Sequence, residues 1–271
     1  MKLTKGKIKK IFFGFFILLL TFSSVLEINE NKSKIRNRLK KTKVVGGQYS
    51  YEVPKDLENE TNRKFALDWA RKINEGGYIL YFRHAERDKW KDVQMYDALE
   101  SDLHDNGPNQ TRFGENTYFS QAVCLNKRGK IQAKGMKEVI EYSKLPVGYI
   151  VTSPSCRARQ TASFVFGGYD KIDRILVHKG PYTENMKKRN EKLKTFFLSL
   201  PLDNDKNTIV SAHNGVIDNS LFSNVISRRD GGPKLKLEEA GFFIISKKDG
   251  ELYLEYEFDS FAHYSKNFFP R

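Results

Sequence analysis

Each of two histidines follows an apolar segment of the kind that forms a buried β-strand. Residues 77–82, Gly-Tyr-Ile-Leu-Tyr-Phe, lead into Arg83 and His84, and residues 207–212, Asn-Thr-Ile-Val-Ser-Ala, lead into His213. Short runs rich in β-branched and aromatic residues are typical of strands. Because α/β sheets bind ligands beyond the carboxyl ends of their strands, we expect both histidines to face one pocket.

A third segment of this kind adds arginines to the same pocket. Residues 148–152 lead into residues 153–162, Ser-Pro-Ser-Cys-Arg-Ala-Arg-Gln-Thr-Ala, which predict the start of a helix carrying Arg157 and Arg159. Arginine donates paired hydrogen bonds to phosphate oxygens and keeps its charge. Two histidines and several arginines at three strand ends therefore predict a site for a phosphoryl group.

The chemistry open to these residues is phosphoryl transfer through histidine. A neutral imidazole nitrogen of His84 would attack phosphorus and form a phosphohistidine. Arg83 and Arg157 would clamp the equatorial oxygens, over which the transferred group spreads its negative charge, and His213 would donate a hydrogen bond to one of them. Arginines beside a histidine disfavour its protonated form and so keep the attacking nitrogen free. The scheme requires no metal ion and no cofactor.

In these motifs the sequence resembles the histidine phosphatase superfamily, the phosphoglycerate-mutase-like enzymes. Members carry Arg-His-Gly/Ala after the first strand, Ser-Pro-x-x-Arg-Ala-x-Gln-Thr-Ala at a later helix start, and a second histidine after a late strand. Residues 125–133, Leu-Asn-Lys-Arg-Gly-Lys-Ile-Gln-Ala, also resemble the family's Leu-Thr-x-x-Gly-x-x-Gln-Ala segment. The four motifs keep the family's order over roughly residues 77–245, which makes the match specific. The resemblance implies a three-layer α/β/α sandwich around a mostly parallel sheet.

Each of these residues also has an ordinary structural interpretation. A single histidine at a strand end is more often a surface or capping residue than a catalytic one. Arg157 and Arg159, two apart on a helix, cannot both face the pocket. The family's pattern selects Arg157, which leaves Arg159 solvated or paired on the surface. His104, His178 and His263 carry no motif and are expected in surface or partly buried positions.

The general acid is the least defined part of the expected site. The resemblance implies either a glutamate after the third strand or an aspartate directly after the second histidine, where this chain has Asn214. Residues 175–184 place Glu184 on a loop after an apolar strand, at the carboxyl end of the sheet. A proton donor also needs a pKa raised by burial or by a like charge. A capping role for Glu184, at a helix starting near Asn185, is an equal alternative.

The net charge of +14 at pH 7 is concentrated near the N-terminus. Residues 1–43 hold twelve basic and two acidic residues, a net of +10, which leaves +4 for the rest of the chain. A nucleic-acid-binding domain is therefore disfavoured. Five lysines in residues 1–10 precede an apolar run of sixteen residues, 11–26. This order is typical of a signal peptide or of an uncleaved membrane anchor, so we expect an exported or membrane-tethered protein.

The chain divides into three expected parts. Residues 1–28 form the signal peptide or anchor, residues 29–58 a basic polar linker, and residues 59–271 one α/β domain. Within the domain, residues 87–124 are a long aromatic-rich insertion after residues 83–86, Arg-His-Ala-Glu, which we call the histidine corner. We interpret this insertion as a lid that selects the alcohol side of a sugar-like or polyol-like substrate, with a surface subdomain as the alternative.

Periodicity and turn residues predict the remaining elements of the domain. Helices are expected at residues 60–75, 191–200 and 215–226, and a hairpin at residues 241–258.

The two cysteines, Cys124 and Cys156, fall beside motif segments. An exported location would permit a disulfide between them. Two buried free cysteines in the wall of the pocket are the favoured interpretation, because free cysteine is among the most buried residue types.

Taken with the resemblance, these patterns predict a metal-independent phosphatase of small phosphorylated molecules, with a membrane as partner only if the N-terminal segment stays uncleaved. Two alternatives stay open: a catalytically inactive phosphate- or phosphosugar-binding module, and a phosphomutase of the same superfamily.

Overall fold

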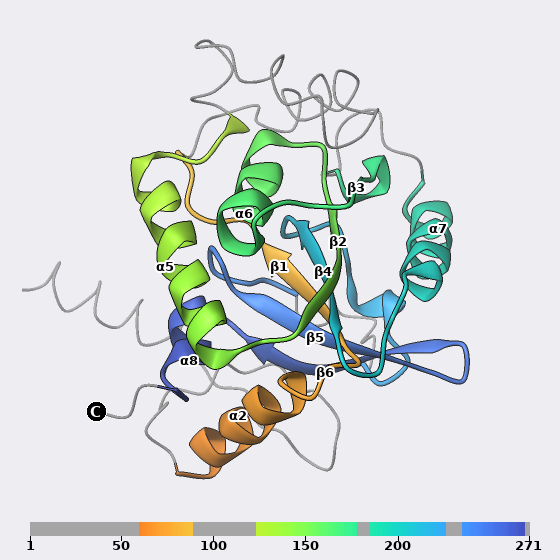
Figure 1. The fold of residues 1–271 in the computed structure, drawn as a ribbon. Coiled ribbons are helices and arrows are strands. Elements are labelled where there is room, and N and C mark those ends of the chain that lie inside the picture. The colour runs from red at the N-terminus through yellow and green to blue at the C-terminus, as the bar shows by residue number, and fades with distance from the viewer. Residues whose placement is uncertain (1–59, 89–122, 178–184, 226–234, 269–271) are drawn as a thin grey trace, which may run out of the picture. The chain divides into compact units, whose positions relative to one another are not determined.

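The computed structural model describes residues 60–88, 123–177, 185–225 and 235–268, which form an α/β domain around one six-stranded sheet (Figure 1). The strands are β1 (Ile79–Arg83), β2 (Val147–Thr152), β3 (Lys171–Ile172), β4 (Asn207–Ala212), β5 (Phe242–Lys248) and β6 (Glu251–Phe258). The helices are α2 (Glu60–Ile73), α5 (Lys127–Ser143), α6 (Cys156–Phe166), α7 (Met186–Ser199) and α8 (Phe261–Ser265), with short 3₁₀ turns η1 (Arg174–Leu176) and η2 (Asn219–Leu221).

The sheet is mostly parallel, as the sequence predicts. Its strand order is β3-β2-β4-β1-β5-β6. Strands β3, β2, β4 and β1 run parallel to their neighbours, while β5 and β6 add an antiparallel edge. The carboxyl ends of β2, β4 and β1 therefore lie at one edge of the sheet, which is where the three motifs begin.

Strand β1 is buried on both faces because helices cover the sheet on each side. Leu80 and Phe82 belong to the same core cluster as apolar residues of α5 and α6, and the Phe82 and Phe166 rings lie 5.3 Å apart between centroids. Tyr81 points to the opposite face, as alternate strand residues must, and packs against Phe197 of α7 at 6.1 Å. Helices α5 and α6 lie side by side in Figure 1. The predicted three-layer arrangement is confirmed.

The predicted hairpin near the C-terminus is also confirmed. Strands β5 and β6 are joined at Asp249 and Gly250, whose φ angles of 53° and 74° are those of a turn that favours Asp-Gly. Phe242 on β5 and Phe258 on β6 pack with ring centroids 5.0 Å apart, and Tyr264 of α8 lies 5.4 Å from Phe242. This aromatic cluster fastens the C-terminal helix to the sheet.

Two predicted elements were wrong in their described parts. The helix expected at residues 215–226 is only the 3₁₀ turn η2, because Asp218 caps that turn by accepting from the backbone N–H of Ser220 and also accepts from the Asn190 side chain at 2.9 Å. The strand expected from Ile175 onward is instead the turn η1, which Asp173 caps by accepting from the N–H of Ile175 at 3.1 Å.

The expected signal or anchor, the linker and residues 89–122 of the expected lid lie outside the described residues, so these remain predictions. In the described part of the chain, no helix is long and apolar enough to cross a membrane.

Candidate active site

His84 stands at the end of the central strand β1, in a buried position. Its backbone N–H continues the parallel ladder by donating to the carbonyl of Ala212 at 3.0 Å, and the residue is only 2% exposed. The Nδ1 atom of the ring lies 2.7 Å from the carbonyl oxygen of Ala85. A carbonyl can only accept, so Nδ1 carries the proton. The other ring nitrogen, Nε2, is then left with its lone pair.

The charge state of His84 agrees with this tautomer. Burial is the main cause that holds its pKa well below the ordinary value of 6.5, and the positive charge of Arg157 lowers it further. The contact with the Ala85 carbonyl acts in the opposite direction, while Arg83 and Arg87 add to the lowering. The imidazole is therefore neutral at pH 7, which is the form required of a nucleophile.

His213 faces His84 from the neighbouring strand. The two rings lie with their centroids 5.3 Å apart and their planes inclined by 61°. His213 is fully buried, its Nε2 lies 3.0 Å from the hydroxyl of Ser153, and its carbonyl accepts from the hydroxyl of Tyr81 at 2.7 Å. Because a hydroxyl both donates and accepts, Ser153 can fix either tautomer of the ring.

Arg157 lies at the start of α6 and is fully buried. Its Nη1 donates to the carbonyl of Val123 at 3.3 Å, and its charge acts on both His84 and Arg83. Thr161, one turn further along α6, donates to the carbonyl of Arg157 at 2.8 Å and accepts from the N–H of Ala85 at 3.0 Å. The helix start and the histidine corner are thus joined directly through one hydroxyl.

Arg83 is the most exposed of the four predicted site residues that the structure describes, with 20% of its side chain accessible. Its Nη1 donates to the carbonyl of Leu237 at 2.8 Å, and its Nη2 pairs with the Glu239 carboxylate at 3.3 Å. Burial lowers the pKa of Arg83. The Glu239 carboxylate raises this pKa, whereas the positive charge of Arg157 lowers it further. The structure therefore brings Arg83, Arg157 and both histidines together, with Arg83 also held from the side of Glu239.

The expectation that Arg159 lies on the surface is wrong. Arg159 is 2% exposed, and its Nε donates to the carbonyl of Pro154 at 2.8 Å. The two arginines do diverge, as their spacing requires, but α6 is buried around most of its first two turns, so neither side reaches solvent. Arg159 binds back onto the loop that precedes the helix.

The preference for free cysteines is also wrong. Cys124 and Cys156 form a disulfide, with Cα atoms 4.8 Å apart and a sequence separation of 32. Both are buried, together with Val123, as the favoured interpretation expected. Their burial gave no information on pairing, because the distance between two motif segments cannot be read from their sequence separation.

The Leu-Asn-Lys-Arg-Gly-Lys-Ile-Gln-Ala motif, residues 125–133, contacts the backbone of the histidine corner. Gln132 accepts from the N–H of Glu86 at 2.9 Å and donates to the carbonyl of Glu239 at 3.3 Å. A Cβ atom on Gly129 would lie 1.9 Å from the carbonyl oxygen of Glu86, so only glycine fits there. Asn126 caps α5 by accepting from the N–H of Gly129 at 2.7 Å. The role of this motif in supporting the corner, as opposed to its presence, was missed by the sequence reasoning.

Asn214 has a structural role. Its amide donates to the carbonyl of Leu237 at 2.7 Å and accepts from the N–H of Leu237 at 3.0 Å. A carboxylate could not make the first of these bonds, because it has no hydrogen to donate. The same Leu237 carbonyl also receives Arg83, so Asn214 and Arg83 share one acceptor.

The remaining predicted residues lie apart from this site or outside the described residues. Glu184, His104 and His178 belong to the segments that the structure does not describe. His263, on α8, is 8% exposed, and its Nδ1 lies 3.1 Å from the Asp259 carboxylate. Within the described residues, no group of three or more histidine, cysteine or acidic side chains is placed to hold a metal ion.

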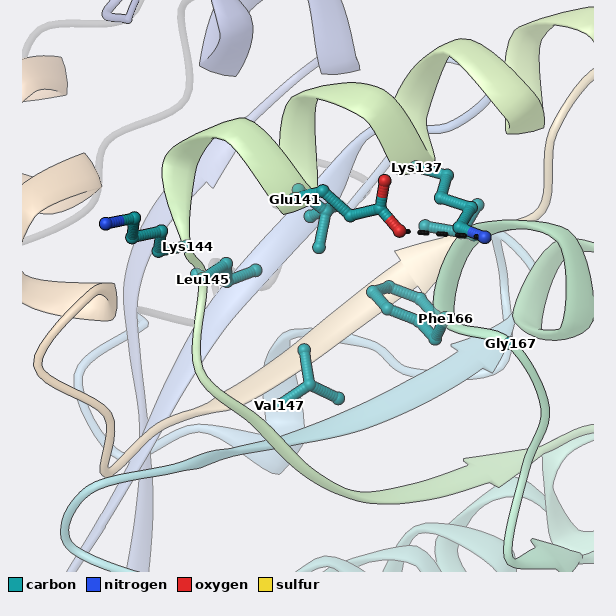
Figure 2. Close-up of a pocket in the computed structure, with 9 residues that line it drawn as sticks. Lys137, Glu141, Lys144, Leu145, Val147, Phe166 and Gly167 are labelled. Atoms are coloured by element: carbon teal, nitrogen blue, oxygen red, sulfur yellow. Dashed lines mark ion pairs between the residues drawn. The ribbon is translucent and has the colours of Figure 1, made fainter.

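A cavity of about 460 Å³ lies elsewhere, between the last turns of α5 and α6 and the start of β2. Lys137 and Glu141 form an ion pair beside it, with Nζ and Oε1 3.6 Å apart. Figure 2 shows this pair together with Leu145, Val147 and Phe166, which supply apolar surface. This position is at the amino end of β2, whereas both histidines follow the carboxyl ends of strands. The cavity is therefore separate from the candidate active site.

The sequence matches no protein-family model, and no curated protein matches it significantly. Among solved structures it is similar to the protein histidine phosphatase SixA complexed with tungstate, at 12% identity over 66% of this chain and 95% of that chain, with a TM-score of 0.42. It is also similar to a phosphoserine phosphatase from Entamoeba histolytica in complex with 3-phosphoglyceric acid, at 15% identity over 69% and 98% of the two chains (TM-score 0.42). A mycobacterial glucosyl-3-phosphoglycerate phosphatase is similar at 15% identity over 68% and 99% (TM-score 0.42).

The class of protein whose motifs the sequence resembles is thus represented among these structures.

Proposed function

We propose that this protein is a metal-independent phosphomonoesterase that acts through a phosphohistidine formed on His84. The observation that carries the proposal is the contact of His84 Nδ1 with the Ala85 carbonyl at 2.7 Å. It places the proton on Nδ1 and leaves the Nε2 lone pair for phosphorus, in a buried ring whose pKa is lowered.

In the first half of the reaction, Nε2 of His84 forms a bond to phosphorus while the bond from phosphorus to the alcohol oxygen breaks. Arg157 and Arg83 stabilise the charge on the equatorial oxygens, and His213 donates a hydrogen bond to one of them. The leaving alcohol oxygen takes a proton, for which Glu184 is the proposed donor. This step leaves a phosphohistidine, a neutral alcohol and an ionised acid.

In the second half, water attacks phosphorus and the bond to Nε2 breaks. The ionised acid accepts the proton that the water loses, so inorganic phosphate is released and both His84 and the acid return to their starting states. No step requires a metal ion or a redox partner. The roles of Arg157 and His213 are supported by their burial, and those of all three residues by their approach to His84.

For the substrate we propose a small phosphomonoester such as a sugar or polyol phosphate. The support is the aromatic-rich segment 87–124, in which Trp90, Tyr96, Phe113 and Tyr118 stand among acids and amides. Aromatic faces and carboxylates are suited to the apolar faces and hydroxyls of such alcohols. A location outside the cytosol is proposed from the N-terminal segment, and the disulfide between Cys124 and Cys156 supports it, because disulfides persist in oxidising compartments.

The test is phosphate release by the full-length protein from a panel of phosphomonoesters, with and without EDTA, beside the His84→Ala variant. We expect turnover that EDTA does not reduce and that His84→Ala abolishes. Binding of vanadate without turnover of any substrate would instead favour the phosphate-binding module. Transfer of phosphate between hydroxyls of one sugar, without net release, would favour a phosphomutase.

A further inference from the structure

The segment that precedes α5 is fastened to α6 at two points. The disulfide joins Cys124 to Cys156, the first residue of α6, and the side chain of Gln160 accepts from the N–H of Leu125 at 2.8 Å. Val123 and the two half-cystines form a small buried cluster at this contact, and Leu125 belongs to the main core cluster, which also includes Ala162 and Val165 of α6. The disulfide adds a covalent constraint on how this segment sits against the helix.

The disulfide and the arginine of the candidate site span the same two segments. Arg157 directly follows Cys156, and the carbonyl that receives Arg157 belongs to Val123, which directly precedes Cys124. Arg157 Nη1 donates to that carbonyl at 3.3 Å. Both residues of this hydrogen bond are therefore sequence neighbours of a half-cystine. Any shift of the segment 123–125 relative to α6 moves this acceptor away from the guanidinium.

Arg157 depends on such an acceptor more than an exposed arginine would. Its side chain is fully buried, and a buried donor that loses its acceptor is strongly unfavourable. An arginine side chain also has many rotamers, so it holds a phosphate oxygen well only if its partners select one of them. A misplacement of about 1 Å in a catalytic arrangement can reduce the rate about 100-fold.

We propose that the Cys124–Cys156 disulfide is a positioning element for Arg157: it fixes the Val123 carbonyl against the guanidinium so that Arg157 meets the transferring phosphoryl group. The inference rests on the proposed function in one respect, the role of Arg157 as a phosphate clamp. A positioning role of the disulfide makes phosphatase activity dependent on the oxidised state of the two cysteines. A dithiol reductant would transfer two electrons and two protons to the disulfide, giving two thiols and the oxidised, cyclic form of the reductant.

The competing explanation is that the disulfide only stabilises the fold, as disulfides generally do. The two explanations differ in a double-mutant cycle. The variants are Cys124→Ala with Cys156→Ala, Arg157→Ala, and the triple variant, each assayed well below its own unfolding temperature. Alanine is chosen because it places no new polar group in the buried cluster. Treatment of the wild type with dithiothreitol is the matched chemical arm, and the cysteine-free variant controls for other effects of the reductant.

We expect the cysteine-free variant to lose about 10- to 100-fold in kcat/KM, by analogy with small misplacements in other sites, and to bind vanadate more weakly by a similar factor. In the Arg157→Ala background, removal of the cysteines should change either quantity less than about twofold. Additive losses in the two backgrounds, or a cysteine-free variant that is less heat-stable but fully active, would overturn the inference. If the wild type binds vanadate but turns over nothing, the proposed function fails, while the binding cycle still decides whether the disulfide positions Arg157.

Discussion

The imidazole rings of His84 and His213 face each other across two adjacent parallel strands, with centroids 5.3 Å apart. Their proximity follows from the strand register, in which Arg83 on β1 pairs with Ala212 on β4. Each histidine is the next residue along its strand, so both leave the sheet at the same level. The sequence places a histidine at the end of each strand, and the parallel pairing makes them one site.

The two arginines of α6 should differ in what their loss does. Arg157→Ala removes a donor to the transferring phosphoryl group. By analogy with loss of an oxyanion-hole donor, it should raise the activation free energy by about 2–4 kcal/mol. Arg159→Ala, the matched control, leaves the Pro154 carbonyl without its 2.8 Å donor. It should lower the free energy of unfolding by about 1–3 kcal/mol with little change in kcat. Equal kinetic losses at the two positions would show that the assignment of Arg157 is wrong.

The stability of the protein should depend on pH through His84. Burial and the charge of Arg157 lower the pKa of His84 in the folded state, whereas the unfolded chain has the ordinary value of 6.5. As pH falls below 6.5 the unfolded chain therefore gains a proton that the folded chain does not. The folded state should lose up to about 1.4 kcal/mol per pH unit there, until the lowered pKa is reached.

The measurement for this prediction is urea unfolding between pH 7.5 and about pH 5, on the wild type and on His84→Asn. The variant lacks the titrating ring, so its unfolding free energy should fall less steeply below pH 6.5. Arg157→Ala removes the second cause of the lowered pKa of His84. It should therefore shift the acid limb of the pH–rate profile to higher pH. Parallel stability curves for the wild type and His84→Asn would contradict the assignment.

Two glycines of α5 provide a matched test of how the helix supports the histidine corner. Gly129→Ala would place a methyl group 1.9 Å from the Glu86 carbonyl oxygen, whereas a methyl group on Gly135 meets nothing within 4 Å. Gly129→Ala should therefore destabilise the fold by about 1–3 kcal/mol and lower activity, because Glu86 lies two residues after His84. Gly135→Ala should stabilise the helix by up to about 1 kcal/mol without changing activity. Thermal unfolding and phosphate release on both variants decide the matter, and similar behaviour of the two would refute the contact.

The general acid can be tested through the leaving group. If Glu184 protonates the alcohol, Glu184→Gln should cripple hydrolysis of alkyl phosphates, whose alkoxides leave poorly without a proton. The variant should largely keep its activity on p-nitrophenyl phosphate, whose phenolate needs no proton. Equal losses on both substrates would show that the acid lies elsewhere, since Asn185 already caps α7 by accepting from the N–H of Lys187 at 3.0 Å. The search for the acid would then turn to Asp88, Asp92 and Asp97, which follow the histidine corner.

Local patterns in the sequence were sufficient to predict β1, β2, β4, β5 and β6 of the central sheet and the residues that follow β1, β2 and β4, but they did not predict β3. Strand β4 occupies residues 207–212, as its apolar run predicts, and β1 and β2 lie within a residue or two of their expected bounds. The hairpin turn at Asp249 and Gly250 could also be predicted from the sequence, because its positive φ angles favour those residue types.

Features set by contacts between distant segments could not be predicted in the same way. The Cys124–Cys156 disulfide depends on the distance between two segments, and the burial of Arg159 depends on how α6 is enclosed. The helix expected after His213 is replaced by a turn, because the Asp218 side chain accepts from the backbone N–H of Ser220 and from Asn190 on α7. Such side-chain competition with a helix becomes visible only when its tertiary partner is known.

The most direct test of the account is to trap the covalent intermediate. The wild-type protein, mixed rapidly with a ³²P-labelled phosphomonoester and quenched in alkali, should carry labelled phosphate that is lost in mild acid, and peptide mapping should place it on His84. The His84→Ala variant should carry none, while Arg159→Ala should still be labelled. Turnover by the wild type without a labelled enzyme species, or retained turnover by His84→Ala, would contradict the mechanism.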